Sequence, residues 1–298
     1  MKQNQKTPVI GITLGDPGGV GPEVVAAALR RFPASKSGVQ LRVLGSKAGV
    51  APGKLTKRSA QYAIDALLES VDLLRRGEIQ AVVNAPVSKE NLSRVGFRHP
   101  GQTEFYAEAF GLGPEEVTMS MQSDKLRVFL VSTHCSLKEA IRRLDADGIC
   151  LHAGHALDVL KKMGIRRPRI AVCGLNPHAG EHGLFGDEEE RFIEPAVLRL
   201  RKKFGPLFHG PFSPDTVFGH ALSGKYDGVL CHYHDQGLIP FKLVAFEDGV
   251  NLTLGLPFWR SSPDHGTALD IAGKGLASCK SFLAALRLTA ALARKPAI

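Results

Sequence analysis

Short apolar runs that end in a histidine-bearing turn recur along this sequence, and they constrain its fold more than any other feature. Three such runs occupy residues 126–132, 169–175 and 228–231. They are rich in Val, Ile and Leu and are bounded by turn residues, which is typical of buried parallel strands. The histidines that follow them are His134, His178 and His234. Ligands of open α/β folds bind outside the carboxyl ends of the strands, so these side chains are expected at one edge of a sheet.

Strand-like and helix-like segments alternate along the whole chain, which favours a mainly parallel sheet with helices on both faces. Pro22 stands where proline suits a helix start, and that helix is expected to continue to about residue 31. Ser136 and Glu139 have the spacing of a capping box, which predicts a helix directly after His134. The other expected elements are strands at 9–14 and 79–84 and helices at 60–76, 149–163, 188–204 and 281–292.

The three strand-end histidines have the chemistry of a catalytic metal site. Imidazole is the commonest protein ligand for zinc-like metals, and catalytic sites keep three protein ligands and one open position. We therefore interpret His134, His178 and His234 as metal ligands, with the alternative that one of them is a general base. Asp215 and Asp235 are available to orient an imidazole, or to act as further ligands or bases.

The composition is that of a soluble globular enzyme, with 44% hydrophobic and 22% charged residues. The polar start of the chain and the short apolar run at residues 9–12 do not have the pattern of a signal peptide, and no stretch is long enough to span a membrane. The five cysteines form no C-x-x-C pair and are odd in number. Free thiols in a reducing cytoplasm are the simplest interpretation.

The net charge of +9 is compatible with an anionic partner. A nucleic acid is disfavoured, because the basic residues occur mostly in pairs and no stacking aromatics are interleaved with them. A phosphorylated small molecule fits the charge better. Three polar residues are each expected in a turn or near a strand end: Lys242, Asn251 and Arg260. Together they offer donors for a phosphate or carboxylate.

The glycine-rich turn at residues 15–21 admits two interpretations. Its backbone N–H groups could cradle a phosphate at the start of the next helix, or the glycines could serve only a tight strand-to-helix turn. The sequence matches neither G-x-G-x-x-G nor a P-loop. Polar residues at 84–89 and 99–104 also follow strand-like or turn-like segments, with Ser88 placed to cap a helix and another helix expected at 105–110.

Taken together, five motifs resemble those of the 4-hydroxythreonine-4-phosphate dehydrogenase (PdxA) family of pyridoxal phosphate biosynthesis. They lie at residues 15–23, 84–89, 175–181, 233–237 and 264–268. The resemblance covers nearly the whole chain. It implies a fold like that of isocitrate and isopropylmalate dehydrogenases, with two α/β/α domains and a cleft between them. We expect residues 1–125 plus 262–298 in the first domain, and residues 126–261, with the metal histidines and the dimer interface, in the second.

The resemblance also implies site residues, cofactors and partners. The family's metal ligands fall on His134, His178 and His234, and its substrate contacts on Lys242, Asn251 and Arg260. A further substrate pair, His-Thr in the family, is Gln102-Thr103 here. The family's cofactors are NAD or NADP and a divalent metal, for which Zn, Co or Mg are the candidates. The partner expected is a second copy of the chain, in a homodimer with shared active sites, with neither nucleic acid nor membrane involved.

The expected reaction is the NAD-dependent oxidation and decarboxylation of 4-hydroxythreonine 4-phosphate to 3-amino-2-oxopropyl phosphate, with Asp215 or Asp235 as the base. Gln102 hydrogen-bonds but does not titrate near neutral pH, which leaves other substrates open. These are 4-phosphothreonate, 4-phosphoerythronate or a cyclic dihydrodiol carboxylate. A metal-dependent phosphohydrolase, a phosphate acyltransferase and a non-catalytic metal- or phosphometabolite-binding protein are the alternatives from other classes.

Overall fold

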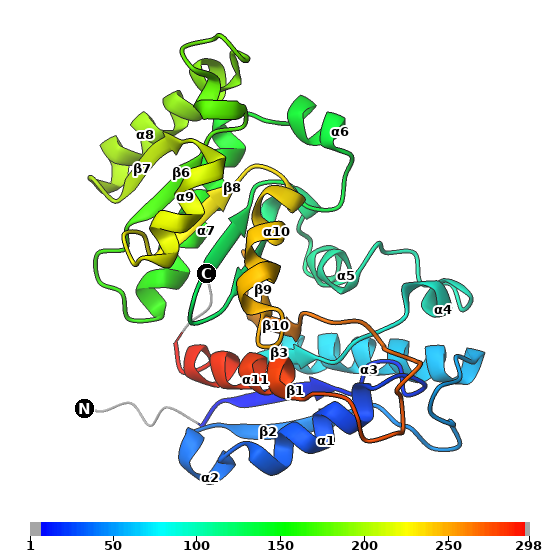
Figure 1. The fold of residues 1–298 in the computed structure, drawn as a ribbon. Helices are drawn as coiled ribbons and strands as arrows, with labels where there is room; N and C mark the ends of the chain where they lie inside the picture. Colours follow the sequence, from blue (N-terminus) through cyan, green and yellow to red (C-terminus); the bar gives the residue numbers. More distant parts are fainter. Residues whose placement is uncertain (1–6, 296–298) are drawn as a thin grey trace. The chain divides into compact units, whose positions relative to one another are not determined.

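The structure is a computed structural model that describes residues 7–295 (Figure 1). The chain divides into two compact units. Among the described residues, unit 1 contains 7–114 together with 247–295, and unit 2 is Glu115–Phe246. Each unit is an α/β structure with its own strands and helices, and each is described by itself below.

The sheet of unit 1 has the strand order β2-β1-β3-β10-β9. β1 is parallel to β2 and β3, β10 is parallel to β3, and β9 is antiparallel to β10. The strands are β1 (Val9–Thr13), β2 (Gln40–Leu44), β3 (Ala81–Asn84), β9 (Val250–Leu254) and β10 (Trp259–Pro263). The helices are α1 (Gly21–Arg31), α2 (Ala34–Ser37), α3 (Lys57–Arg75), α4 (Lys89–Ser93), α5 (Gln102–Ala109) and α11 (Lys280–Leu292).

The sheet of unit 2 has the order β4-β5-β8-β6-β7, and only the β4–β5 pair is antiparallel. Its strands are β4 (Thr118–Gln122), β5 (Arg127–Leu130), β6 (Ile170–Cys173), β7 (Phe208–Phe212) and β8 (Gly228–Cys231). Its α-helices are α6 (Leu137–Arg142), α7 (Ala146–Lys162), α8 (Glu194–Phe204), α9 (Pro214–Leu222) and α10 (His234–Ala245). Shorter helical turns are η1 (Pro114–Glu116), η2 (Pro177–Gly180) and the π-helical η3 (Glu189–Ile193).

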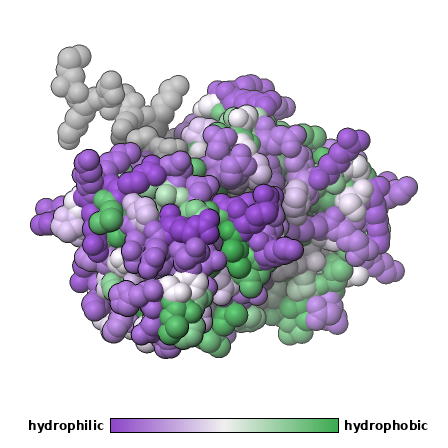
Figure 2. Space-filling view, turned by 90° about the horizontal axis from the view of Figure 1, so that it is seen from above, coloured by the Kyte–Doolittle hydropathy of each residue, from purple (hydrophilic) through white to green (hydrophobic). Residues whose placement is uncertain are grey.

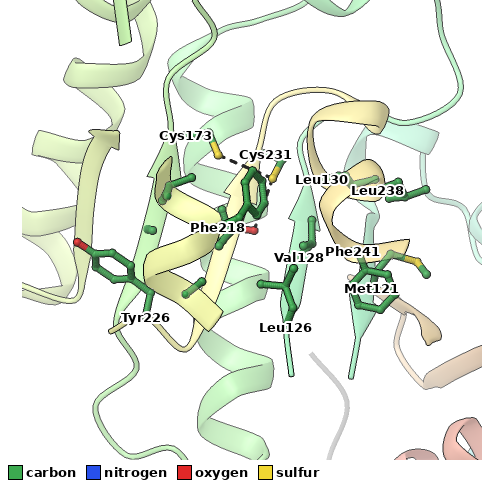
Figure 3. Close-up of a cluster of buried hydrophobic side chains, with 14 of the residues drawn as sticks. Met121, Leu126, Val128, Leu130, Cys173, Phe218, Tyr226, Cys231, Leu238 and Phe241 are labelled. Carbon is green, nitrogen blue, oxygen red and sulfur yellow. Dashed lines mark hydrogen bonds between the residues drawn. The ribbon is translucent and has the colours of Figure 1, made fainter. Parts of the chain in front are cut away.

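The core of unit 2 fixes the strands that precede the histidines. Side chains of β5 and β8 pack against α9 and α10 on one face of the sheet, and α7 lies behind it (Figure 3). Val128 and Val229 are fully buried, as are Phe241 of α10 and Val217 of α9. Each buried side chain of this size stabilises the fold by about 1.5–3 kcal/mol. The strand ends are therefore held by a well-packed layer.

The strands and most helices agree with those expected from the sequence, but two local details differ. α3 begins at a capping box between Thr56 and Ser59, several residues before the apolar stripe. Ser136 caps α6 by accepting from the Glu139 N–H. The Glu139 carboxylate, however, accepts hydrogen bonds from Arg142 and Arg143 rather than completing a capping box. The short i, i+3 and i, i+4 spacing of these arginines explains the difference.

The division into units also differs from the expected domain limits. Residues 115–125 were expected in the first domain, yet β4 pairs with β5 in unit 2. Residues 247–261 were expected in the second domain, yet β10 pairs with β3 in unit 1. Strand pairing decides both limits: β4 pairs with the neighbouring β5, whereas β10 pairs with β3 from a distant part of the chain. Sequence periodicity carries no information about this pairing.

In Figure 2 most of the visible face is hydrophilic, with smaller hydrophobic patches between the polar groups. Of the helices in residues 7–295, none has both the length and the apolar character needed to cross a membrane.

Candidate active site

The histidine edge is the set of turns that follow β5, β6 and β8 in unit 2. These three strands are adjacent and parallel, so their carboxyl ends lie at one edge of the sheet. His134 follows β5, and His234 is the first residue of α10, just after β8. Their ring centroids are 5.7 Å apart. The structure thus brings together two of the three predicted metal ligands.

A glycine allows this close approach of α10 to β5. A Cβ atom at Gly237 would lie 2.4 Å from Val128 Cγ1, which is closer than real Cβ atoms come to a neighbour. Gly237 stands one turn after His234, so the contact fixes the start of α10 beside the end of β5.

Asp235 orients His234. The imidazole Nδ1 lies 2.6 Å from the Asp235 Oδ1. With the carboxylate as acceptor, Nδ1 carries the proton and the Nε2 lone pair is left for another partner. Carboxylate–histidine pairs of this kind hold metal-binding imidazoles in the required tautomer. Of the two predicted catalytic carboxylates, it is therefore Asp235 that contacts a histidine. Asp215, in the first turn of α9, instead accepts from the Ser213 hydroxyl at 2.6 Å.

His178 is the third predicted ligand, and it follows β6. It is in η2 with φ at +52°, and its ring centroid is 6.0 Å from that of Phe185. It lines a cavity together with Glu181, His182 and Glu190. Within residues 7–295, no group of three or more His, Cys, Asp or Glu side chains is arranged to hold a metal. The position of His178 as a third ligand remains a prediction.

The arginine pocket is the second polar cluster, and it lies in unit 1 around Arg260 of β10. This side chain is 3% exposed. Its Nε donates to Asn84 Oδ1 at 2.8 Å, and its Nη1 donates to the hydroxyls of Thr103 at 3.2 Å and Thr253 at 3.1 Å. Burial lowers the pKa of Arg260 to about 10, so the guanidinium is charged at neutral pH. All three acceptors are neutral, and Glu104 is a carboxylate whose negative charge favours the charged form of the guanidinium.

Gln102 and Thr103 form the first turn of α5 rather than the preceding loop. The helix was expected to begin near residue 105, but it starts at Gln102 after an extended Gly101. The Gln102 amide donates to the Ala85 carbonyl at 3.3 Å, and its Oε1 is buried without a hydrogen-bond partner among the described residues. The position where the family has histidine therefore presents a free acceptor.

Asn251 and Lys242 belong to different units. Asn251 is on β9, beside β10, and its Oδ1 is buried without a hydrogen-bond partner in the described part of the chain. Lys242 is in α10 of unit 2, not in a turn or at a strand end as expected, with its Nζ 6.0 Å from the Phe246 ring centroid. α10 continues through Pro240, a residue that normally ends a helical pattern, which is why the sequence did not indicate it.

Most of the residues that hold Arg260 in place were not indicated by any sequence pattern. Asn84 donates from its Nδ2 to Thr13 Oγ1 at 3.1 Å and to the Tyr106 hydroxyl at 3.0 Å. Tyr106 is fully buried, its hydroxyl lies 2.7 Å from Ser70 Oγ, and burial raises its pKa. The strand-end position of Asn84 was the one visible signal. Nothing in the sequence linked Tyr106 or Thr253 to this pocket.

The glycine turn at residues 15–21 does not offer a phosphate cradle. Four of its N–H groups already donate within the protein: those of Asp16, Gly18, Gly19 and Val20. The acceptors include the Asp16 side chain, the Pro86 carbonyl and the Thr267 carbonyl. Gly15 has φ at +68°, and a Cβ there would lie 2.2 Å from the Pro86 oxygen. Of the two interpretations of this turn, the structure supports the tight strand-to-helix turn.

Imidazoles at parallel strand ends and a buried arginine are features of α/β enzymes that act on small anions. Comparison with known proteins makes the class specific. Residues 22–289 match the family described as pyridoxal phosphate biosynthetic protein PdxA, and the chain belongs to this family.

Individual relatives agree with this assignment. The chain is 42% identical to 4-hydroxythreonine-4-phosphate dehydrogenase of Beijerinckia indica, over 92% of this chain and 91% of the relative. It is 39% identical to D-threonate 4-phosphate dehydrogenase of Salmonella typhimurium, over 97% of this chain and 100% of the relative. These relatives are named dehydrogenases, and the chain is accordingly an oxidoreductase of this family.

Solved structures confirm the predicted fold class. The crystal structure of 4-hydroxythreonine-4-phosphate dehydrogenase from Klebsiella pneumoniae matches with a TM-score of 0.81 and 36% identity, over 98% of this chain and 100% of the other. Isocitrate dehydrogenase from Methylococcus capsulatus matches with a TM-score of 0.60 and 15% identity, over 96% of this chain and 88% of the other. The second likeness concerns the fold alone.

Proposed function

We propose that this protein catalyses the NAD(P)-dependent, divalent-metal-dependent oxidation and decarboxylation of 4-hydroxythreonine 4-phosphate to 3-amino-2-oxopropyl phosphate, in pyridoxal phosphate biosynthesis. The observation that carries the proposal is the buried Arg260, whose three hydrogen-bond acceptors are neutral. A guanidinium fork whose hydrogen-bond acceptors are neutral suits the oxygens of an anion, while the Glu104 carboxylate contributes a negative charge that favours its charged form. The relatives named for this activity supply the identity of that anion.

In this proposal Arg260 and Lys242 bind the substrate phosphate. Arginine matches phosphate oxygens with its planar fork, and lysine acts as a point charge. Thr103, Gln102 and Asn251 supply neutral contacts, and the unpartnered Oε1 of Gln102 and Oδ1 of Asn251 are acceptors for substrate hydroxyl or ammonium groups. Fixing the phosphate orients the reacting carbon, which contributes several kcal/mol to the rate.

The histidine edge fits a divalent metal in its donor chemistry. His134 and His234 lie close together, and Asp235 sets the tautomer of His234. His134, His178 and His234 would hold the ion, and an imidazole set suits Zn or Co better than Mg. When bound, the ion would act as a Lewis acid on the substrate hydroxyl and stabilise negative charge during decarboxylation.

The carboxylates of this unit would move the proton of the hydroxyl. Asp235 uses Oδ1 on His234, and its side chain is 70% exposed, so a proton that it accepts can pass to solvent. Asp215 is the other candidate base, directly or through water. The hydride from the carbon that carries this hydroxyl would go to the nicotinamide cofactor. The resulting β-keto acid would lose carbon dioxide.

The cofactor must bind without the usual glycine-rich cradle, because the N–H groups of residues 16–20 are largely occupied. One buried acceptor in unit 1 fits a nucleotide. Glu23 accepts from the Gly273 N–H through Oε2, while its Oε1 is buried without a partner in residues 7–295. A carboxylate of this kind suits a ribose hydroxyl. We further propose a cytoplasmic homodimer with shared active sites, in which unit 2 provides the interface.

The test is NADH formation by the purified protein with 4-hydroxythreonine 4-phosphate, with Zn²⁺, Co²⁺, Mg²⁺ or chelator added in parallel. Metal-dependent NADH production is the expected result. Phosphate release without NADH would instead indicate a phosphohydrolase, and tight binding of substrate without turnover would indicate a binding protein. Either outcome would overturn the proposal.

A second candidate is a dehydrogenase for D-threonate 4-phosphate or 4-phosphoerythronate. The observation that favours it is Gln102, a non-titrating amide with a free acceptor where the family has histidine. The phosphate contacts of Arg260 would be the same. The same assay with threonate 4-phosphate distinguishes the two, because the preferred substrate has the higher kcat/KM.

A further inference from the structure

Glu189 is a buried carboxylate that the proposed chemistry does not use. It is the first residue of η3 and is 2% exposed. Its Oε1 accepts from the backbone N–H groups of Leu175 at 2.7 Å and Asn176 at 2.8 Å, and its Oε2 accepts from Asn176 Nδ2 at 2.9 Å. All three donors are neutral. A carboxylate buried in this way is costly unless its hydrogen bonds are complete, so this arrangement requires an explanation.

The hydrogen bonds of Glu189 fix the backbone just before His178. Asn176 and His178 are separated only by Pro177, whose ring restricts the intervening backbone. Asn176 Nδ2 also donates to Glu188 Oε2 at 2.7 Å. Residues 176–189 therefore form a loop whose two ends are joined by hydrogen bonds. His178 lies near the start of this loop.

Glycines clear the space around this junction. A Cβ at Gly174 would lie 3.1 Å from Glu189 Oε1, and one at Gly180 would lie 2.8 Å from Glu189 Oε2. A Cβ at Gly186 would lie 2.5 Å from Asn176 Nδ2. Larger side chains at these positions would push the carboxylate and the amide apart, so the surroundings are shaped to the junction.

The same segment is also tied to the end of β8, from which His234 follows. Gln236 Nε2 donates to the Gly174 carbonyl at 2.8 Å, and its Oε1 accepts from the His232 N–H at 2.8 Å. His232 Nε2 lies 2.7 Å from the Cys173 carbonyl oxygen. The end of β6 is thus held from the β8 side by Gln236 and His232, and from the η3 side by Glu189.

We propose that Glu189 is the positioning residue for His178, and that its hydrogen bonds to residues 175 and 176 set where the imidazole enters the histidine edge. This inference rests on the proposed function, because it assumes that His178 is a metal ligand. Glu189 contacts neither metal nor substrate in this role. It acts through the backbone, and its loss leaves the Leu175 and Asn176 N–H groups without their acceptor.

The experiment is a Co²⁺ titration of the full-length protein, followed by visible absorption, for the wild type, Glu189→Gln, His178→Ala and the double variant. The substitution Glu189→Gln keeps one acceptor oxygen but places an amide N–H₂ against Asn176 Nδ2. We expect Glu189→Gln to weaken Co²⁺ binding about 10- to 100-fold and to change the absorption band, as losses of outer supporting groups do. In the His178→Ala background the same change should have almost no further effect.

Glu190→Gln is the matched control, since Glu190 is the exposed neighbour on the same cavity. It should bind Co²⁺ as the wild type does. Asn176→Ala removes the side-chain hydrogen bonds to Glu189 Oε2 and Glu188 Oε2 but keeps the two backbone contacts of Glu189 Oε1. It should give a smaller loss, and it serves if Glu189→Gln does not fold. Wild-type affinity in Glu189→Gln, or an equal loss with and without His178, would overturn the role of Glu189 while metal-dependent NADH formation by the wild type stands. A wild type that does not bind Co²⁺ would overturn both proposals.

Discussion

The arginine pocket of unit 1 and the histidine edge of unit 2 are organised differently. In the pocket, Arg260 comes from a central strand and is fixed by three hydrogen bonds to side chains that are themselves buried or partly buried. At the histidine edge, His134 and His234 lie together, whereas His178 is on a loop with several residues at positive φ: His178, Ala179, Glu181 and His182. One cluster is assembled by a sheet and the other depends on a loop.

We expect this difference to separate substrate binding in unit 1 from metal-dependent chemistry in unit 2. An arginine held rigidly by hydrogen bonds binds an anion with little reorganisation, which lowers the cost of ordering the site. Non-glycine residues at positive φ each cost about 1–3 kcal/mol of folding free energy, and such conformations persist only where surrounding contacts impose them. In unit 2 those contacts include the hydrogen bonds of Glu189. We therefore expect substitutions in the two clusters to have separable effects on phosphate binding and on metal binding.

The largest effect is expected from His234→Ala. Loss of a ligand oriented by Asp235 should remove the metal and lower kcat at least about 10⁴-fold, corresponding to roughly 5 kcal/mol of transition-state stabilisation. Chelation of the wild type should give the same loss. Substrate binding through Arg260 should persist, as measured by calorimetry with the phosphorylated substrate. The control is His220→Ala at an exposed position of α9; a comparable loss of kcat there would contradict the assignment.

Arg260→Lys should have the next largest effect, and this effect should fall on substrate binding rather than on metal binding. Lysine keeps the charge but cannot reproduce three hydrogen bonds in that fork geometry. We expect the KM for the phosphorylated substrate to rise about 10²- to 10³-fold, which corresponds to about 3–4 kcal/mol of binding free energy. Co²⁺ binding should not change. Arg42→Lys, in an exposed ion pair with Glu78, is the control and should be nearly silent. Loss of metal binding in Arg260→Lys would show that the two clusters are not separable.

The two clusters also differ in how far the sequence could predict them. The runs before His134, His178 and His234 were recognisable because a buried parallel strand has a local signature. Their common edge then follows from parallel pairing. The contacts of Arg260 were not recognisable, because Asn84 and Thr103 are more than 150 positions away along the chain. Hydrogen bonds between such distant segments leave no trace in local composition.

The loop of His178 marks the other limit of prediction. Positive φ at His178 and at Ala179 is disfavoured by the residue types themselves, so no local rule indicates it. It is imposed by tertiary contacts, among them the burial of the Glu189 carboxylate. α10 was missed for a related reason, since packing of Phe241 and Leu238 maintains a helix across Pro240. The family resemblance supplied the roles that local patterns could not.

Lowering the pH should distinguish the two units by their stability. His152 and His155 of unit 2 share one hydroxyl, with Thr118 Oγ1 lying 2.6 Å and 2.8 Å from their Nδ1 atoms. Burial lowers the pKa of His152 to about 4 and also lowers that of His155. The unfolded chain takes up a proton near pH 6.5 and the folded chain does not, so stability should fall as the pH drops from about 6.5 to 4. The loss through His152 is about 3 kcal/mol.

Unit 1 should be less affected over this range, because none of its described residues is a buried histidine. Hydrogen exchange of β4 and α7 reports unit 2, and the emission of Trp259, the single tryptophan, reports unit 1. His152→Gln should reduce the pH dependence of exchange in unit 2, and the remainder should come from other histidines such as His232, whose burial lowers its pKa to about 4. Equal loss of protection in both units would mean that they unfold together and that stability does not distinguish them.

The smallest effect is expected from Gln102→His, which restores the residue type of the family. Gln102 is in the first turn of α5, and its Oε1 is buried without a partner among residues 7–295, so an imidazole would replace a neutral acceptor with a titratable one. If 4-hydroxythreonine 4-phosphate is the substrate, we expect kcat/KM to change less than about tenfold, or about 1.4 kcal/mol. The pH profile should gain an inflection near 6.5. Gln61→His, on the exposed side of α3, controls for the substitution itself. A rise well beyond tenfold, together with poor wild-type turnover, would instead favour threonate 4-phosphate as the natural substrate, because the wild-type amide would then be adapted to an acid that lacks the amino group.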